Sequence, residues 1–218
     1  AVIEELHLAN NTLVIFTSDN GATPKDFQGT QGVHLNLASE AGNVREKFKT
    51  AKADAKALGH VTNGPWHDGK GSPYEGGHRV PFIARWPGRI RPDSSSDQTI
   101  CMTDLFATVA DILQVELPEN AAEDSMSVLP VLLGREEFRL ARKAVFVQGD
   151  TRDNAIAVCS GRWKMIESRD ADGGVQRELY DLDSDPGETA NVAAGHPEIV
   201  GTLADTLARA RSDGRTRF

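Results

Sequence analysis

Residues 10–21, NNTLVIFTSDNG, contain the stretch that decides the fold. Residues 12–17 form an uninterrupted apolar run that lacks the polar alternation of a half-exposed strand. We therefore expect a strand covered on both faces, within the parallel or mixed sheet of an α/β domain. Ligands of open α/β sheets bind beyond the carboxyl ends of the strands, so Asp19 and Asn20 lie where a site is expected.

The side chains of Asp19 and Asn20 suit a hard cation. Carboxylate and amide oxygens are good ligands for Ca²⁺ and poor ligands for soft metals. The alternative is an ordinary turn, because Asp-Asn-Gly is a common turn sequence in which Gly21 accommodates a positive φ.

The second notable stretch is GKGSPYEGGHRVP, residues 69–81, which leads into a further expected strand at residues 80–86. Glycines on both sides of Lys70 allow close backbone approach to a ligand, and its ammonium suits a sulfate or phosphate oxygen. A solvated loop lysine is the alternative. Glu75 and Arg79 are four residues apart, which predicts an ion pair that orders the turn.

The remaining pattern predicts a partial α/β unit followed by a small α+β unit, with the boundary near residue 143. We expect the end of a helix at residues 1–9 and an amphipathic stripe at residues 44–58 in a long polar segment. A further helix follows at residues 103–113, with Thr103 as its N-cap. Past residue 143 the pattern predicts short antiparallel strands and then a helix. The strands are expected at 144–148, 155–159, 162–167 and 178–182, and the helix at 197–211.

Composition limits the function. A chain of 218 residues, 39% of them hydrophobic, is long enough to bury roughly 70% of its unfolded surface. The net charge of −8, without a basic stripe, argues against nucleic-acid binding. Cys101 and Cys159 lack metal-ligand spacing and are expected to be buried free thiols. The sequence has no apolar run that approaches the length of a membrane span.

Several separated motifs, in order, resemble the C-terminal portion of the sulfatases, in particular the arylsulfatases and N-acetylgalactosamine-6-sulfatases. They are NNTLVIFTSDNG, GKGSPYEGGHRVPFIARWPG, CMTDLFATVADIL, SMSVLPVLLG, GRWKMI and ELYDLDSDPGE. The resemblance implies an alkaline-phosphatase-like fold and the hydrolysis of sulfate esters of aryl or sugar substrates. It implies that Asp19 and Asn20 are calcium ligands, and that Lys70 is a catalytic residue that contacts the sulfate.

The same resemblance exposes what these 218 residues lack. Sulfatases use a formylglycine made from Cys or Ser in a C/S-x-P-S/A-R motif, and neither cysteine here has that context. We expect the formylglycine and two further calcium-binding aspartates on a missing N-terminal portion of the same domain, so the isolated chain should be inactive. Family members are often exported, which implies a periplasmic or extracellular location.

Histidines near Lys70 could reach the substrate. His67 and His78 are candidate substrate-binding residues, as is His60, although a loop or supporting role is the alternative for each. The polar segment at residues 22–68 is a candidate substrate-specificity loop. Two other interpretations remain: a related metal-dependent phosphatase or phosphodiesterase, and a noncatalytic sulfatase fragment.

Overall fold

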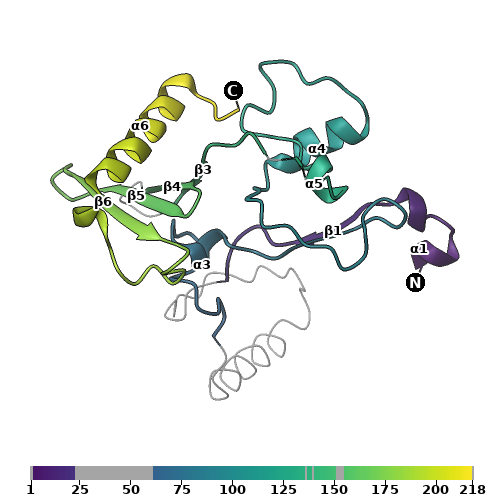
Figure 1. Cartoon of the computed structure of the whole chain (residues 1–218), viewed down its shortest axis with the longest axis horizontal. Coiled ribbons are helices and arrows are strands. Elements are labelled where there is room, and N and C mark those ends of the chain that lie inside the picture. Colours follow the sequence, from purple (N-terminus) through teal and green to yellow (C-terminus); the bar gives the residue numbers. More distant parts are fainter. Residues whose placement is uncertain (1, 23–60, 136, 139, 151–154, 218) are drawn as a thin grey trace, which may run out of the picture.

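The computed structural model describes residues 2–22, 61–135, 137–138, 140–150 and 155–217. A two-stranded ribbon extends to one side of a four-stranded sheet, and the helix α6 covers that sheet (Figure 1). The amphipathic stripe expected at residues 44–58, and most of the expected specificity loop, lie outside the described residues. No helix in the described part of the chain is long and apolar enough to cross a bilayer.

The first expected strand pairs with the second as an antiparallel ribbon. β1 (Val14–Thr17) follows α1 (Val2–Glu5) and the 3-10 turn η1 (Ala9–Asn11), and it pairs with β2 (Phe82–Arg85). Both strands are confirmed, but the expected cover on both faces is not. Phe16 and its partner Ile83 are 62% and 61% exposed, because no described segment packs over that side of the ribbon.

The four predicted strands past residue 143 are confirmed as an antiparallel sheet in the order β3-β4-β5-β6. They are β3 (Val145–Gln148), β4 (Ile156–Ser160), β5 (Trp163–Arg169) and β6 (Val175–Asp181). β6 begins three residues earlier than expected, because Val175 pairs with Arg169 at the start of the hairpin. The Asp170 carboxylate closes this turn by accepting a hydrogen bond of 2.6 Å from the Gly174 amide.

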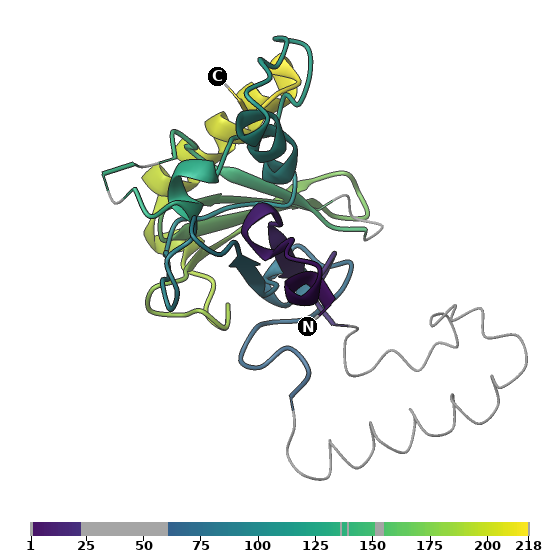
Figure 2. The ribbon, with the colours of Figure 1, turned by 90° about the vertical axis from the view of Figure 1, so that its right-hand side faces the viewer.

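The two faces of this sheet are covered by different parts of the chain. α6 (Pro197–Asp213) packs on one face, where its buried Leu203 and Leu207 contact Val158, Met165 and Leu179. The segment that contains α3 (Glu75–His78) packs on the other face, where Tyr74 meets Tyr180. Figure 2 shows α6, in yellow, lying along one side of the sheet. The predicted helix at residues 197–211 and its inward leucines are therefore confirmed.

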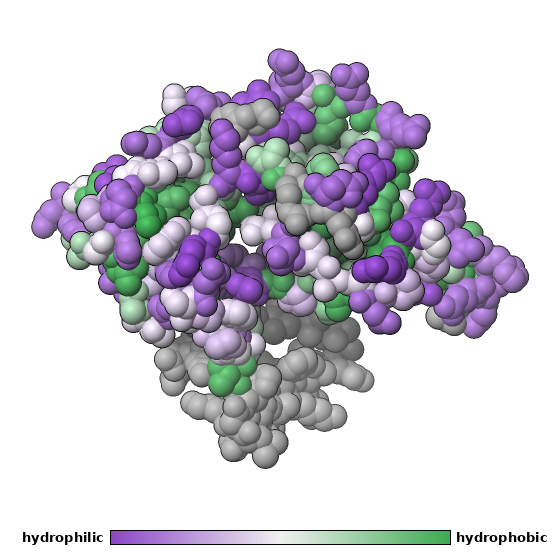
Figure 3. Space-filling view, in the orientation of Figure 1, coloured by the Kyte–Doolittle hydropathy of each residue, from purple (hydrophilic) through white to green (hydrophobic). Residues whose placement is uncertain are grey.

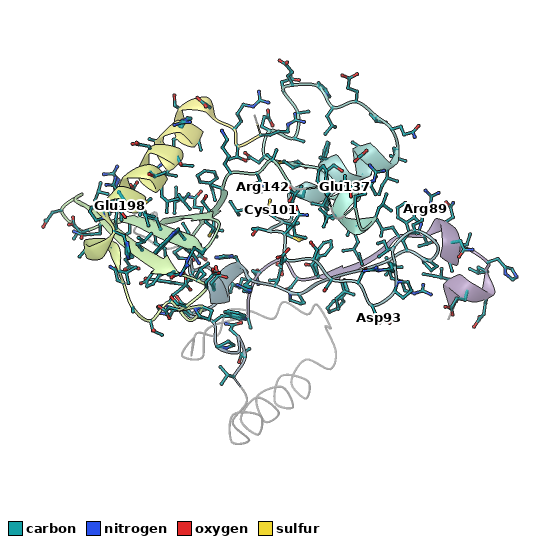
Figure 4. The ribbon with its side chains drawn as sticks, in the orientation of Figure 1. Arg89, Asp93, Cys101, Glu137, Arg142 and Glu198 are labelled. Carbon is teal, nitrogen blue, oxygen red and sulfur yellow. The ribbon has the colours of Figure 1, made fainter. Side chains whose placement is uncertain are left out.

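Helix α4 (Asp104–Ile112) is confirmed, but the predicted cap is wrong. Thr103 has helical backbone angles and its side chain makes no capping hydrogen bond. The Asp104 carboxylate instead accepts hydrogen bonds from two amides outside the helix, those of Cys101 (2.8 Å) and Met126 (3.0 Å), and it also pairs with Arg142. Figure 4 shows Cys101 and Arg142 close together beside α4 and the short helix α5 (Leu129–Leu132).

The apolar side of α4 lies largely at the surface of the described structure. Phe106, Val109 and Leu113 are 61%, 51% and 65% exposed, whereas the smaller Ala107 and Ala110 are buried. The space-filling view shows hydrophobic residues, in green, at the surface among hydrophilic ones (Figure 3). Both cysteines are free thiols, as predicted, although each is only partly buried.

Asp104 provides a test of this packing. Its side chain is 1% exposed and pairs with the 6% exposed Arg142, so Asp104→Ala leaves a buried cation uncompensated. We expect the free energy of unfolding in urea to fall by about 3–5 kcal/mol. The control Asp111→Ala removes an exposed carboxylate from the same helix, where it accepts a bond from Ser127. Equal losses in the two variants would contradict the assigned role.

Candidate functional site

The end of β1 places Asp19 and Asn20 on a hydrogen-bonded turn. The Ser18 hydroxyl donates to the Asn20 carbonyl at 2.9 Å, and the Asn20 side-chain NH₂ donates to the Gly21 carbonyl at 3.0 Å. Because the Asn20 Nδ2 donates to Gly21, the Oδ1 oxygen is the side-chain atom of Asn20 that can bind a cation. Asp19 is exposed, so its carboxylate is accessible to a ligand.

The segment at residues 66–74, here termed the lysine loop, is bonded directly to this turn. The Lys70 amide donates to the Ala22 carbonyl at 2.9 Å, only two residues after Asn20. The Gly21 amide donates to the Gly77 carbonyl at 2.8 Å, which ties the end of β1 to α3 as well. The backbones of the predicted calcium ligands and of the predicted sulfate-binding lysine therefore lie side by side.

Glycines make this approach possible. A Cβ at Gly21 would lie 1.7 Å from the carbonyl oxygen of Gly76, and one at Gly76 would lie 2.4 Å from the carbonyl oxygen of His67. Both distances are far below any real contact, so no side chain fits at either position. The motif residues Gly76 and Gly77 thus serve close packing of backbone on backbone.

A residue of the C-terminal unit also reaches the lysine loop. The Asp150 amide, just past β3, donates to the Gly71 carbonyl at 2.8 Å. The Asp150 carboxylate occupies the space that a Cβ at Gly71 would need, 2.3 Å from that position. Gly71 has a φ of +86°, which also favours glycine.

Beneath the lysine loop lies a buried group of charges, here termed the ion cluster: Glu75, Lys164 and Glu188. The Lys164 Nζ lies 3.0 Å from Glu75 Oε1 and 2.7 Å from Glu188 Oε1, and the side chains are 0–6% exposed. Arg79 completes it from the outside at 2.9 Å from Glu75 Oε2, which confirms the predicted Glu75–Arg79 ion pair. Arg79 also lies over the Trp66 ring, 4.1 Å from its centroid.

Burial and charge act in opposition on the two carboxyl groups of the ion cluster. Burial alone would raise the pKa of Glu75, but the Lys164 ammonium outweighs it, so the pKa of Glu75 is lowered. Burial raises the pKa of Glu188 despite the attraction of the same ammonium.

The two candidate histidines have different surroundings. His67 is exposed and stacks on Tyr74, with ring centroids 4.1 Å apart. His78 directs its Nε2 at the buried Lys164 Nζ, 3.0 Å away, so its ring belongs to the interior rather than to the exposed side of the lysine loop. Burial and the nearby ammonium lower the pKa of His78 to about 4, which keeps the imidazole neutral. His60 lies outside the described residues.

Sequence patterns alone did not identify Lys164, Glu188 or Asp150 as neighbours of this site. One signal was present for Lys164, which stands in the apolar run WKMI of a predicted strand. A lysine on the covered face of a strand requires an acidic partner. Within residues 2–22, 61–135, 137–138, 140–150 and 155–217, no group of three or more His, Cys, Asp or Glu side chains could hold a metal.

Comparison with known proteins gives the class that this chain belongs to. The model described as "Sulfatase" matches residues 1–115, and "N-sulphoglucosamine sulphohydrolase, C-terminal" matches residues 64–213. The chain belongs to the sulfatase family.

Individual relatives agree with this assignment. The N-acetylgalactosamine-6-O-sulfatase of Bacteroides thetaiotaomicron is 36% identical over 94% of this chain, and human steryl-sulfatase is 32% identical over 62% of it. The chain spans only 37% and 19% of the lengths of these two relatives.

Solved structures confirm the alkaline-phosphatase-like sulfatase fold. A structure from work on glycosaminoglycan metabolism by Bacteroides thetaiotaomicron has a TM-score of 0.73 and 32% identity, covering 96% of this chain and 41% of the other. Another, solved with D-glucosamine-2-N,6-O-disulfate, has a TM-score of 0.66, and at 21% identity it supports the fold alone. It covers 96% of this chain and 36% of the other.

Gly21→Ala tests the close backbone packing. Its Cβ would collide with the Gly76 carbonyl, so we expect a loss of about 1–3 kcal/mol or more in the free energy of unfolding. Gly201→Ala in α6 is the control, since open space surrounds that position and alanine favours a helix. Urea denaturation should show the second variant as stable as the wild type or more so; a neutral Gly21→Ala would refute the packing.

His78 predicts a pH dependence. Its pKa of about 4 in the folded protein is below its ordinary value of 6.5, so between these values the unfolded chain binds the extra proton. Stability should therefore fall as the pH drops from 6.5 towards 4. From about pH 7.5 to about pH 5, the wild type should lose roughly 1–2 kcal/mol more than His78→Gln.

Urea midpoints at the two pH values measure this difference. His7→Gln replaces an exposed histidine and should keep the wild-type dependence. If His78→Gln showed the same pH dependence as the wild type, a neutral buried His78 would be ruled out.

Proposed function

We propose that this chain supplies part of the calcium and sulfate site of a sulfatase that hydrolyses sulfate esters of aryl or sugar substrates. The observation that carries the proposal is the hydrogen bond from the Lys70 amide to Ala22, which sets the lysine loop beside Asp19 and Asn20. Family membership gives the reaction class. As the chain spans 37% of its Bacteroides relative, the activity is assigned to the whole protein.

Lys70 is the proposed catalytic residue. Its side chain is exposed, on a loop whose backbone is held at the Ala22 carbonyl. A positioned ammonium stabilises the charge that develops on the sulfate oxygens and the leaving group, and it does so without reorganising water. His67, exposed on the same loop, is proposed to contact the substrate. His78 is proposed to support that contact from below, since its ring faces Lys164.

Asp19 and Asn20 are proposed as two ligands of a calcium ion. Their oxygens have the right chemistry, but together they offer about three of the six to eight donors that Ca²⁺ takes. The remaining donors would come from an N-terminal portion of the same domain. When bound, the ion supplies Lewis-acid polarisation of the sulfate group.

The nucleophile is proposed to come from that same portion, because no C/S-x-P-S/A-R sequence occurs among the 218 residues. Residues 1–143 would then be part of the α/β catalytic domain, and residues 144–218 would form the C-terminal subdomain. A sulfated carbohydrate is the substrate class favoured by the name of the Bacteroides relative, an N-acetylgalactosamine-6-O-sulfatase. Residues 22–68 are the proposed specificity segment.

Lys70→Ala tests this assignment in the protein that includes the nucleophile-bearing portion. We expect kcat for an aryl sulfate to fall by about 10²–10³, the scale seen when one transition-state donor is removed. Arg91→Ala is the control and should leave kcat unchanged. It removes an exposed cation that follows the last residue of β2, whereas Thr17, which leads to Asp19, pairs with the first residue of β2.

If kcat fell by less than about threefold in Lys70→Ala, Lys70 would be a solvated loop residue and not a catalytic one. Assay of the 218-residue chain alone gives the baseline. It should show no turnover of an aryl sulfate, and measurable turnover would refute the need for a further portion.

A further inference from the structure

The ion cluster joins two distant parts of the chain. Lys164 stands in β5 and Glu188 follows β6, both in the C-terminal unit, whereas Glu75 is the first residue of α3. The side chains of Lys164 and Glu188 are both 0% exposed. The contact between the C-terminal unit and α3 is thus electrostatic and buried.

Glu188 bonds the backbone of α3 as well as the lysine. Its Oε1 pairs with Lys164, while its Oε2 accepts a hydrogen bond of 2.7 Å from the Glu75 amide. The Glu75 carboxylate in turn pairs with the same ammonium at 3.0 Å. Side chain and backbone of Glu75 are therefore both held, which fixes the position and the rotation of α3.

α3 is bonded in turn to both halves of the candidate anion site. The Gly76 amide donates to the His67 carbonyl in the lysine loop at 2.8 Å. The Gly77 carbonyl accepts from the Gly21 amide, next to Asn20, at 2.8 Å. A displacement of α3 would accordingly disturb its bonds to the loop that carries Lys70 and to the turn that carries Asn20.

Stability alone is a poor explanation for the ion cluster. Burying three charged groups costs desolvation energy, and apolar side chains of similar size often serve a core as well or better. What charged groups add is directional contact at fixed distances. The ammonium has three N–H donors, and Glu75, Glu188 and the Nε2 of His78 lie within 3.0 Å of it.

We propose that Lys164 and Glu188 are positioning residues of the anion site: they hold α3, and through it the lysine loop, in the geometry that presents Lys70 beside Asp19 and Asn20. This inference rests on the proposed function for its meaning, but its structural content can be tested separately. It makes a strand and a turn of the C-terminal subdomain part of the sulfate-binding apparatus.

Native-state hydrogen exchange on the 218-residue chain tests the coupling. In Lys164→Met, the amides of Lys70, Gly76 and Gly21 should exchange at least about tenfold faster relative to the Val158 amide in β4. Tenfold is the change that loss of one charge-assisted hydrogen bond produces. Glu188→Gln keeps the shape of the side chain and should give the same pattern in a milder form, so it decides the question if Lys164→Met does not fold.

Glu167→Gln is the matched control. Glu167 lies on the opposite face of the same strand, where it pairs with Arg177 and Arg211 at 3.0 and 2.8 Å. This variant should leave the exchange of the Lys70, Gly76 and Gly21 amides at the wild-type ratio to Val158. Uniform acceleration of all amides in Lys164→Met and Glu188→Gln, or unchanged exchange in the lysine loop, would overturn the proposal.

A sulfate titration links the coupling to anion binding. The Lys70 amide signal of the wild type should shift with added sodium sulfate, with sodium chloride at equal ionic strength as the reference. Lys164→Met and Glu188→Gln should need at least about threefold more sulfate, whereas Glu167→Gln should match the wild type. Equal sulfate affinity in all variants would overturn the positioning role. No shift in the wild type would count against the proposed anion site, and the exchange ratios would still decide whether the ion cluster holds the loop.

Discussion

The ammonium of Lys164 is the constraint on which the arrangement depends. It lies on the covered face of β5 with no exposed surface, and an unpaired charge there would be prohibitively costly. Its partners must therefore be brought to it. Glu75 is 89 residues away in sequence and Glu188 follows the next strand. A single buried cation thus requires that α3 and the C-terminal sheet meet in one way.

Glycine carries this constraint from α3 to the candidate site. Gly21, Gly76 and Gly77 let three backbone segments touch without intervening side chains, and each contact includes an amide-to-carbonyl hydrogen bond. Side chains in a packed core can change rotamer, but backbone contacts at this distance leave no room for adjustment. The two halves of the site therefore keep their relative position although Lys70 and Asp19 are themselves exposed.

Local pattern predicted much of this fold and only part of the site. The period of the apolar residues in α6 and the turn residues between β4, β5 and β6 are properties of short segments, and those predictions were confirmed. The burial of Lys164 could not be predicted from local pattern, because it depends on which other segments cover the strand. Dependence on what covers a strand also explains Phe16 and Ile83. The apolar pattern predicted strands covered on both faces, but these two side chains are exposed in the described structure.

Charge balance separates the buried groups from the exposed ones. Lys164 and Arg79 provide two cations around Glu75 and Glu188, which provide two carboxylates, and the neutral His78 adds no charge. The ion cluster and Arg79 together therefore contribute little net charge beneath the lysine loop. Under the proposed function, positive potential for the sulfate would come from Lys70 and from the calcium proposed at Asp19 and Asn20. In the proposed arrangement the buried charges set the geometry, and the exposed ones contact the ligand.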